Sequence, residues 1–197
     1  MKQTLNIEQQ QTLLAQARAS IVYGCKYKAY LAADKNLLKL AAFSQIAASF
    51  ITLKTKSSME LRGCTGTLTA TKSLLLDVIE HAYAAAFQDS RFAPVREDEI
   101  DDIHLAISVI SPMELLPVSS ERELLANLRP NMDGLLIEQA GHRATFLPSV
   151  WEQLRDKQSF LRQLKQKAGL SADYWSADLR AYRYTTCYFQ EPLEYEP

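Results

Sequence analysis

Two of the six glycines in this chain, Gly63 and Gly66, lie within four residues of each other, and Cys64 stands between them. Glycine loses more conformational entropy on folding than any other residue, so this spacing predicts positive φ angles, a close approach of the backbone to another group, or both. A bound molecule and a tight contact within the fold would each account for it. Arg62 precedes the pair, and a neighbouring positive charge lowers the pKa of a thiol. The segment 61–67 is therefore the first candidate for a site.

The length of 197 residues suits one sizeable core better than two independent domains. We predict a single domain over residues 1–197 with two lobes. The formal net charge of −1 gives no global field that would attract nucleic acid or an anionic membrane, although a local basic groove stays open as an alternative. Residues 1–11 lack the apolar core of a signal peptide, and no apolar run approaches the length of a membrane span, which predicts a cytoplasmic protein.

Three cysteines, Cys25, Cys64 and Cys187, are widely spaced. Their odd number and spacing argue against a disulfide framework and against a zinc knuckle, so we expect free thiols. The chain also lacks a phosphate-binding P-loop, a dinucleotide fingerprint and a Gly-x-Ser-x-Gly elbow. No cofactor is predicted.

The acidic run at 97–102 has no histidine and no ordered ligand spacing, so no metal site is predicted there either.

Local patterns predict an α+β fold with a mixed or antiparallel sheet flanked by helices, because strands and helices alternate without a regular βαβ rhythm. Helical spacing behind capping residues, including Asn6 with Gln9 and Ser120 with Glu123, predicts helices at 6–33, 73–87, 120–129 and 156–168. Extended patterns predict strands at 42–53, 61–68, 103–111, 134–139, 143–147 and 179–190. The first two strands should form a hairpin, as should 134–139 and 143–147. We expect 103–111 to be half-buried and expect Tyr182, Tyr184 and Tyr188 to share one strand face.

Several motifs follow one another in a characteristic order. They are Leu61-Arg62-Gly63-Cys64-Thr65-Gly66-Thr67, Phe87-Gln88-Asp89-Ser90-Arg91-Phe92-Ala93-Pro94, Ser108-Val109-Ile110-Ser111-Pro112, Phe146-Leu147-Pro148-Ser149-Val150-Trp151, Phe160-Leu161 with Lys167-Ala168-Gly169-Leu170, and Tyr174-Trp175. In these motifs and their order, nearly the whole chain resembles the AMME chromosomal-region (AMMECR) domain family. Thr65 departs from the family, which more often carries isoleucine there.

The resemblance implies an α+β fold with a larger and a smaller lobe. Bacterial members of the family are named AmmeMemoRadiSam system protein A, which implies a Memo-type protein and a radical S-adenosylmethionine protein as partners. No two cysteines of this chain are close in sequence, so the iron–sulfur centre of radical chemistry would belong to a partner.

Cys64 is a tentative catalytic residue, because a thiolate beside Arg62 could act as a nucleophile. The alternative is a small buried residue on a sheet face, since free cysteine is among the most buried residue types. A base partner would come from His81, His104 or His142, the side chains that titrate near neutral pH. None of the three has a diagnostic spacing, so a solvated or structurally hydrogen-bonded role is favoured for each.

Asp89 and Arg91 bracket Ser90 directly after a predicted helix whose start follows the cysteine strand, so the chain could return them toward Cys64. They could form a local cap and ion pair. If they line a cleft instead, Arg91 and Arg62 offer two planar cations suited to phosphate or carboxylate. The ligand-binding candidates are Arg62, Gly63, Cys64, Thr65, Gly66, Asp89 and Arg91.

Two functions of different class follow. The first is a binding or accessory component for a small anionic or nucleotide-like ligand or a partner peptide, for which Arg62→Ala and Arg91→Ala should weaken binding while Cys64→Ser is nearly silent. The alternative is an enzyme or covalent carrier that Cys64→Ser should inactivate. A third interpretation is a scaffold whose motif glycines only allow close packing. Cationic recognition beside the glycines is the better supported of these, so binding is the preferred hypothesis.

Overall fold

The structure is a computed structural model that describes residues 5–192. The chain divides into two compact units: Met1–Ile110 with Cys187–Pro197, and Ser111–Thr186. Mixed helices and strands, with antiparallel pairing wherever the register is described, confirm the predicted α+β class. Whether the two units fold as one domain stays a prediction. In the described part of the chain, no helix has the length and apolar character needed to cross a membrane.

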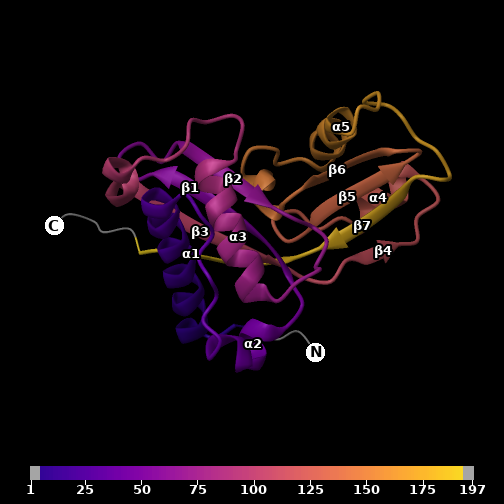
Figure 1. The fold of residues 1–197 in the computed structure, drawn as a ribbon. Coiled ribbons are helices and arrows are strands. Elements are labelled where there is room, and N and C mark those ends of the chain that lie inside the picture. Colours follow the sequence, from indigo (N-terminus) through magenta and orange to yellow (C-terminus); the bar gives the residue numbers. More distant parts are fainter. Residues whose placement is uncertain (1–4, 193–197) are drawn as a thin grey trace. The chain divides into compact units, whose positions relative to one another are not determined.

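The first unit is a four-stranded sheet covered by helices (Figure 1). Its strand order is β2-β1-β3-β8. Its elements are α1 (Ile7–Tyr27), η1 (Leu37–Lys39), α2 (Ala41–Ser44), β1 (Ala48–Thr55), β2 (Leu61–Gly66), α3 (Leu74–Phe87), η2 (Glu97–Asp102), β3 (Ile103–Ile110) and β8 (Thr186–Gln190). The predicted hairpin is confirmed, because β1 pairs antiparallel with β2, and β3 lies on the other side of β1.

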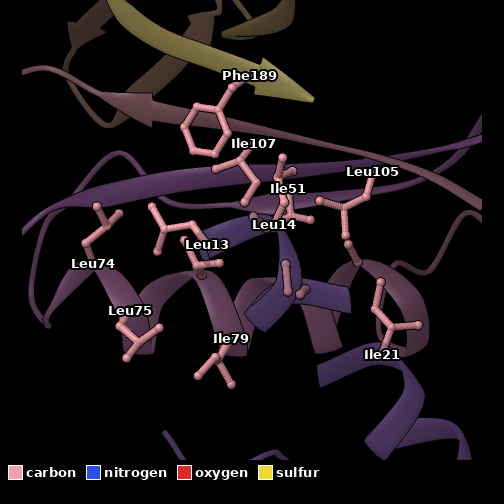
Figure 2. Packing of buried hydrophobic residues seen from close by; sticks show 14 of the residues in the cluster. Leu13, Leu14, Ile21, Ile51, Leu74, Leu75, Ile79, Leu105, Ile107 and Phe189 are labelled. Carbon is pink, nitrogen blue, oxygen red and sulfur yellow. The ribbon is translucent and has the colours of Figure 1, made fainter. Parts of the chain in front are cut away.

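The core of this unit lies between the two long helices and one face of the sheet. Figure 2 shows side chains of α1 and α3 packed against Ile51, Leu105, Ile107 and Phe189 of the strands. In α3, which was predicted as a helix at 73–87, the apolar stripe that includes Leu75 is buried. Removing this much apolar surface from water is the main free-energy gain that holds the helices on the sheet.

The second unit is another four-stranded sheet, with the order β4-β7-β5-β6. Its elements are β4 (Glu114–Leu116), α4 (Glu121–Asn127), β5 (Gly134–Gln139), β6 (His142–Phe146), η3 (Pro148–Glu152), α5 (Lys157–Lys167) and β7 (Arg180–Tyr184). The predicted hairpin between β5 and β6 is confirmed. Trp151 and Phe160 stack at the centre of its core with ring centroids 3.8 Å apart, and Trp151 Nε1 donates to the Asp133 carbonyl at 2.7 Å.

The helices differ from the sequence prediction in three respects: the end of α1, an additional helical turn, and the cap of α4. The capping box of Asn6 and Gln9 is confirmed, but α1 ends at Tyr27 instead of residue 33 because Lys28 adopts a left-handed conformation. Ala41–Ser44 forms a helical turn where a strand was predicted, with the Phe43 and Ser44 amides bonded to the Leu40 carbonyl. At α4 the capping box is incomplete, since the Glu123 carboxylate accepts from Ser119 N–H and not from Ser120 N–H.

β4 was not predicted, and two further strand predictions were wrong. β3 is buried on both faces, because His104 is covered by the chain at Glu191, whose carbonyl lies 3.1 Å from its Nε2. The predicted strand 179–190 breaks at Thr185, whose backbone exchanges hydrogen bonds with Ser111, and its halves join different sheets. The tyrosines therefore do not share one face: Tyr184 is buried, whereas Tyr188 is exposed.

Candidate functional site

The glycines of the Cys64 strand permit close approach of other groups. A Cβ at Gly63 would lie 2.2 Å from the carbonyl oxygen of Ala85 in α3, and a Cβ at Gly66 would lie 2.4 Å from both Cγ of Phe50 and the Ser49 carbonyl oxygen. Neither is among the positive-φ glycines of the described chain. Of the two reasons predicted for these glycines, close approach holds and positive φ does not. The approaching groups belong to the fold itself.

Arg62 lies at an irregularity of the β1–β2 hairpin, and its side chain pairs with Glu99. The register shifts between Leu53 and Lys54, which oppose Gly63 and Leu61, so Arg62 is an extra residue of β2. Its Nε and Nη2 lie 3.0 and 3.3 Å from the two carboxylate oxygens of Glu99, and its side chain is 17% exposed. Hydrogen bonding from Arg62 lowers the pKa of Glu99, more than partial burial raises it. Glu99 therefore compensates the positive charge of Arg62, which we had expected to act on the Cys64 thiol or on a ligand.

Asp89 and Arg91 clamp the peptide of Cys64, as their place after α3 had suggested. Asp89 Oδ2 accepts from Cys64 N–H at 2.9 Å, and Arg91 Nη2 donates to the Cys64 carbonyl at 3.3 Å. β2 is an outer strand of its sheet, so these side chains supply the donor and acceptor that a further strand would have supplied. The clamp protects the sheet edge at this residue.

The two clamp residues are also paired with each other. Arg91 Nε and Nη2 donate to Asp89 Oδ1 and Oδ2 at 2.9 and 2.7 Å. This bonding, with the Cys64 and Arg91 amides, holds the pKa of Asp89 far below its ordinary value although burial acts in the opposite direction. Asp89 is 7% exposed, whereas Arg91 is 55% exposed. The result is a fixed carboxylate beneath a guanidinium that water can reach.

The thiol of Cys64 is half-buried and lies 3.6 Å from the Thr52 hydroxyl, on the residue that opposes it across the hairpin. A hydroxyl is not a base that would produce a thiolate at neutral pH. The histidines have other partners: His81 Nδ1 lies 3.1 Å from Asp77 Oδ2, and His142 Nδ1 lies 2.8 Å from the Ala168 carbonyl. His104 and His142 thus have the structural hydrogen-bond contacts that the sequence favoured, whereas the buried His81 Nδ1 lies near Asp77 without making a hydrogen bond.

The seven predicted ligand-binding residues thus do not form one cluster. Cys64, Asp89 and Arg91 are joined by hydrogen bonds, while Arg62 turns to Glu99. Thr65 pairs with Ile51 and, as the neighbour of Cys64 in a strand, points to the opposite face. Their role in binding stays a prediction.

Sequence reasoning missed Thr52 and Glu99. The register of the hairpin could have indicated Thr52, but Glu99 lies 37 residues from Arg62 and gave no signal beyond its acidic run. Among the described residues, no three His, Cys, Asp or Glu side chains are arranged to hold a metal ion.

Comparison with known proteins identifies a family and several relatives of this chain. A model of the AMMECR1 family matches residues 14–189. Protein MJ0810 of Methanocaldococcus jannaschii is 36% identical over 166 residues, which cover 82% of this chain and 83% of that protein. Protein MK0488 of Methanopyrus kandleri is 30% identical over 197 residues, with 97% and 92% covered. The crystal structure of the uncharacterized protein PH0010 from Pyrococcus horikoshii superposes with a TM-score of 0.87 at 28% identity, covering 95% of this chain and 94% of that one.

Proposed function

The chain belongs to the AMMECR1 family, and from the geometry around Cys64 we propose that it is a binding or accessory component. The observation that carries this proposal is the state of Arg91. Its Nε and Nη2 are held by Asp89 and by the Cys64 carbonyl, yet its side chain is 55% exposed. A planar cation that is oriented before binding loses little entropy when it takes a carboxylate or phosphate.

The ligand we propose is a carboxylate or phosphate group of a small or nucleotide-like molecule or of a partner peptide. Asp89 offsets part of the Arg91 charge, so recognition would depend on hydrogen-bond geometry as well as on charge. Within the described residues Arg91 Nη1 makes no hydrogen bond and remains a donor for this group. Arg62 contributes less to such a site, since Glu99 already binds it.

Titration with inorganic pyrophosphate and with glutarate, followed by backbone amide chemical shifts, tests this function. We expect saturable shifts at Cys64 and Asp89 that Arg91→Gln removes. Arg96→Gln is the matched control, because Arg96 makes the same two-residue-apart pair with Asp98 and is 72% exposed, but it does not bind the Cys64 strand. Equal responses of the two variants, or no saturable shift with either anion, would contradict the proposal.

The alternative, an enzyme or covalent carrier, is favoured by one observation: the Cys64 thiol is only half-buried, so reagents can reach it. This function requires Cys64→Ser to abolish labelling by iodoacetamide at this position and any turnover, while binding of the anions above would be unaffected. A thiol that reacts no faster than Cys25 or Cys187, both of which have a pKa raised chiefly by burial, would argue against it.

We also propose the partners implied by the family resemblance, a Memo-type protein and a radical S-adenosylmethionine protein. The support is the family membership. Mixing the purified proteins and measuring their co-elution in size-exclusion chromatography tests it. Separate elution of this chain from both proteins at micromolar concentration would contradict a stable complex.

A further inference from the structure

Beside the clamped Cys64, the outer edge of β2 has backbone groups that bond to nothing else in the described chain. Thr67 N–H donates to the Ser49 carbonyl at 3.1 Å, so Thr67 and Ser49 form a hydrogen-bonded pair. The next pair along the hairpin, Gly66 and Phe50, is then one without hydrogen bonds, and the N–H and C=O of Gly66 point away from β1, as those of Cys64 do. Within residues 5–192 neither group of Gly66 makes a hydrogen bond. Gly66 thus offers one donor and one acceptor to an extended chain.

The clamp limits how far such a chain could pair with β2. Asp89 Oδ2 already accepts from Cys64 N–H, and Arg91 Nη2 already donates to the Cys64 carbonyl. A strand that continued past Gly66 in this direction would find both groups of Cys64 in use, so its own backbone groups would lack partners there. An extended segment therefore fits best if it ends beside Cys64.

The charge at this place selects which end of a chain fits. β2 runs from Leu61 to Gly66, so an antiparallel strand added to its outer edge brings its C-terminal end to Cys64, and a parallel strand brings its N-terminal end. The Arg91 guanidinium lies at Cys64, is 55% exposed, and has Nη1 free among the described residues. It attracts a terminal carboxylate and repels a terminal ammonium group. The antiparallel direction and a C-terminus are therefore favoured.

We propose that the outer edge of β2 binds the C-terminus of a partner protein as an added antiparallel strand, which rests on the proposed function of Arg91. The penultimate residue of the partner would exchange both hydrogen bonds with Gly66. The last residue would lie opposite Thr65, and its carboxylate would accept from Arg91 Nη1. Strand addition at a sheet edge and capture of a terminal carboxylate are both recurring modes of peptide recognition.

Gly66 also sets a preference for the penultimate side chain. Directly opposed residues of antiparallel strands project their side chains to the same face, with Cβ atoms within about 5.5 Å. On that face Gly66 has no side chain, and the ring of the half-buried Phe50 takes its place, since a Cβ at Gly66 would lie 2.4 Å from Phe50 Cγ. An aliphatic side chain opposite Gly66 would pack beside this ring. We therefore expect valine or leucine at the penultimate position.

A second copy of this chain is the other occupant that could pair with the edge, and the structure favours it less. The β2 strand of a second copy carries the same clamp at Cys64, so its own edge is restricted in the same way. As an internal strand, it also brings no terminal carboxylate to Arg91.

The test uses the peptide acetyl-Ser-Thr-Thr-Ser-Val-Ala with a free C-terminal carboxylate, and follows amide chemical shifts and hydrogen exchange. We expect saturable shifts at Cys64, Gly66 and Asp89 and slower exchange of Gly66 N–H. The C-terminal amide of the same peptide should bind about tenfold more weakly, because it loses a charge-assisted hydrogen bond. N-methylation at the valine, which removes the donor to the Gly66 carbonyl, and glycine in place of the valine should each weaken binding about fivefold.

Glutarate separates this inference from the proposed anion site, since it should shift Cys64 and Asp89 without slowing the exchange of Gly66 N–H. Arg91→Gln should weaken binding of both ligands, while Arg96→Gln should bind both like the unmodified chain.

If glutarate binds but the peptide does not slow exchange at Gly66, or if the carboxylate, amide and N-methyl peptides bind equally, strand addition is overturned and the anion site stands. If neither ligand binds saturably, both proposals fail. A dimer that protects Gly66 N–H without peptide would assign the edge to a second copy and also overturn the inference.

Discussion

Replacing Asp89 by asparagine tests whether the clamp on Cys64 stabilises the sheet edge. The Asp89 carboxylate accepts four hydrogen bonds, from the Cys64 amide at 2.9 Å, from the Arg91 amide at 3.2 Å, and from Arg91 Nε and Nη2 at 2.9 and 2.7 Å. Asparagine has the same size but no charge, and one end of its amide is a donor that faces other donors. The substitution therefore removes the charge and about half of the acceptor capacity without leaving a cavity.

The expected loss of unfolding free energy is about 2 kcal/mol at pH 7. A hydrogen bond to a charged group contributes roughly 1.5 to 3 kcal/mol, and the bond from Cys64 N–H is the one best shielded from water. The bonds to Arg91 add less, because that side chain is more than half exposed and its pairing is screened by solvent. We therefore count chiefly the Cys64 bond.

The effect should depend on pH in a definite direction. Bonding from Arg91 and the Cys64 amide lowers the pKa of Asp89 below its unfolded value of about 3.9. A carboxyl whose folded pKa is lowered stabilises the fold above the unfolded pKa, and this contribution disappears as the pH falls toward the folded pKa. The difference between the unmodified chain and Asp89→Asn should therefore be full at pH 7 and smaller at pH 3.

Urea unfolding at both pH values measures this difference, and hydrogen exchange of the Cys64 amide shows whether the loss is local. We expect exchange at Cys64 to become faster in Asp89→Asn. Asp98→Asn is the control, since Asp98 makes the same pair with Arg96 on an exposed segment and should have no measurable effect. If Asp89→Asn is as silent as Asp98→Asn, or if its effect does not decrease at acid pH, the clamp does not stabilise the fold.

Two further predictions concern the groups around the same sheet. Gly63→Ala should lower the unfolding free energy by about 1 to 3 kcal/mol, because the new Cβ meets the Ala85 carbonyl oxygen of α3. An unchanged urea midpoint would show that α3 can move away without cost. Burial lowers the pKa of His104; the positive charges of Lys54, Lys56 and Arg18 add to this effect, and Glu191 opposes it. The free energy of unfolding should therefore fall as the pH drops below about 6.5, where the histidine of the unfolded chain takes up a proton. His104→Gln, measured at pH 7.5 and 5.5, should reduce this slope; an unchanged slope would assign it to other groups.

Local patterns predicted the elements whose stability arises from neighbouring residues. The capping box at Asn6 and the apolar stripe of α3 are such features, because their partners are three or four residues away. The hairpin of β1 and β2 was also predicted, since its turn joins adjacent strands. The break at Thr185 was not predicted, because its bonds go to Ser111, 74 residues earlier.

At the candidate site, too, local features were predicted from the sequence and long-range contacts were not. Its motif residues were found in the sequence, and the return of Asp89 and Arg91 toward Cys64 was foreseen from their position directly after the helix that follows the cysteine strand. The pairing of Arg62 with Glu99 was not foreseen, and it gives the guanidinium a carboxylate of the fold as its partner. The ring contact between Tyr30 and Tyr83 also escaped sequence reasoning, because it forms only after two helices have packed.

The sequence by itself determined the family, the α+β class and the segment around Cys64, because these depend on residue order and local periodicity. Only the tertiary structure decided what the motif glycines are for. Gly63 admits the Ala85 carbonyl and Gly66 admits the Phe50 ring, and close approach between such groups depends on how helix and sheet pack, a property that no single segment contains.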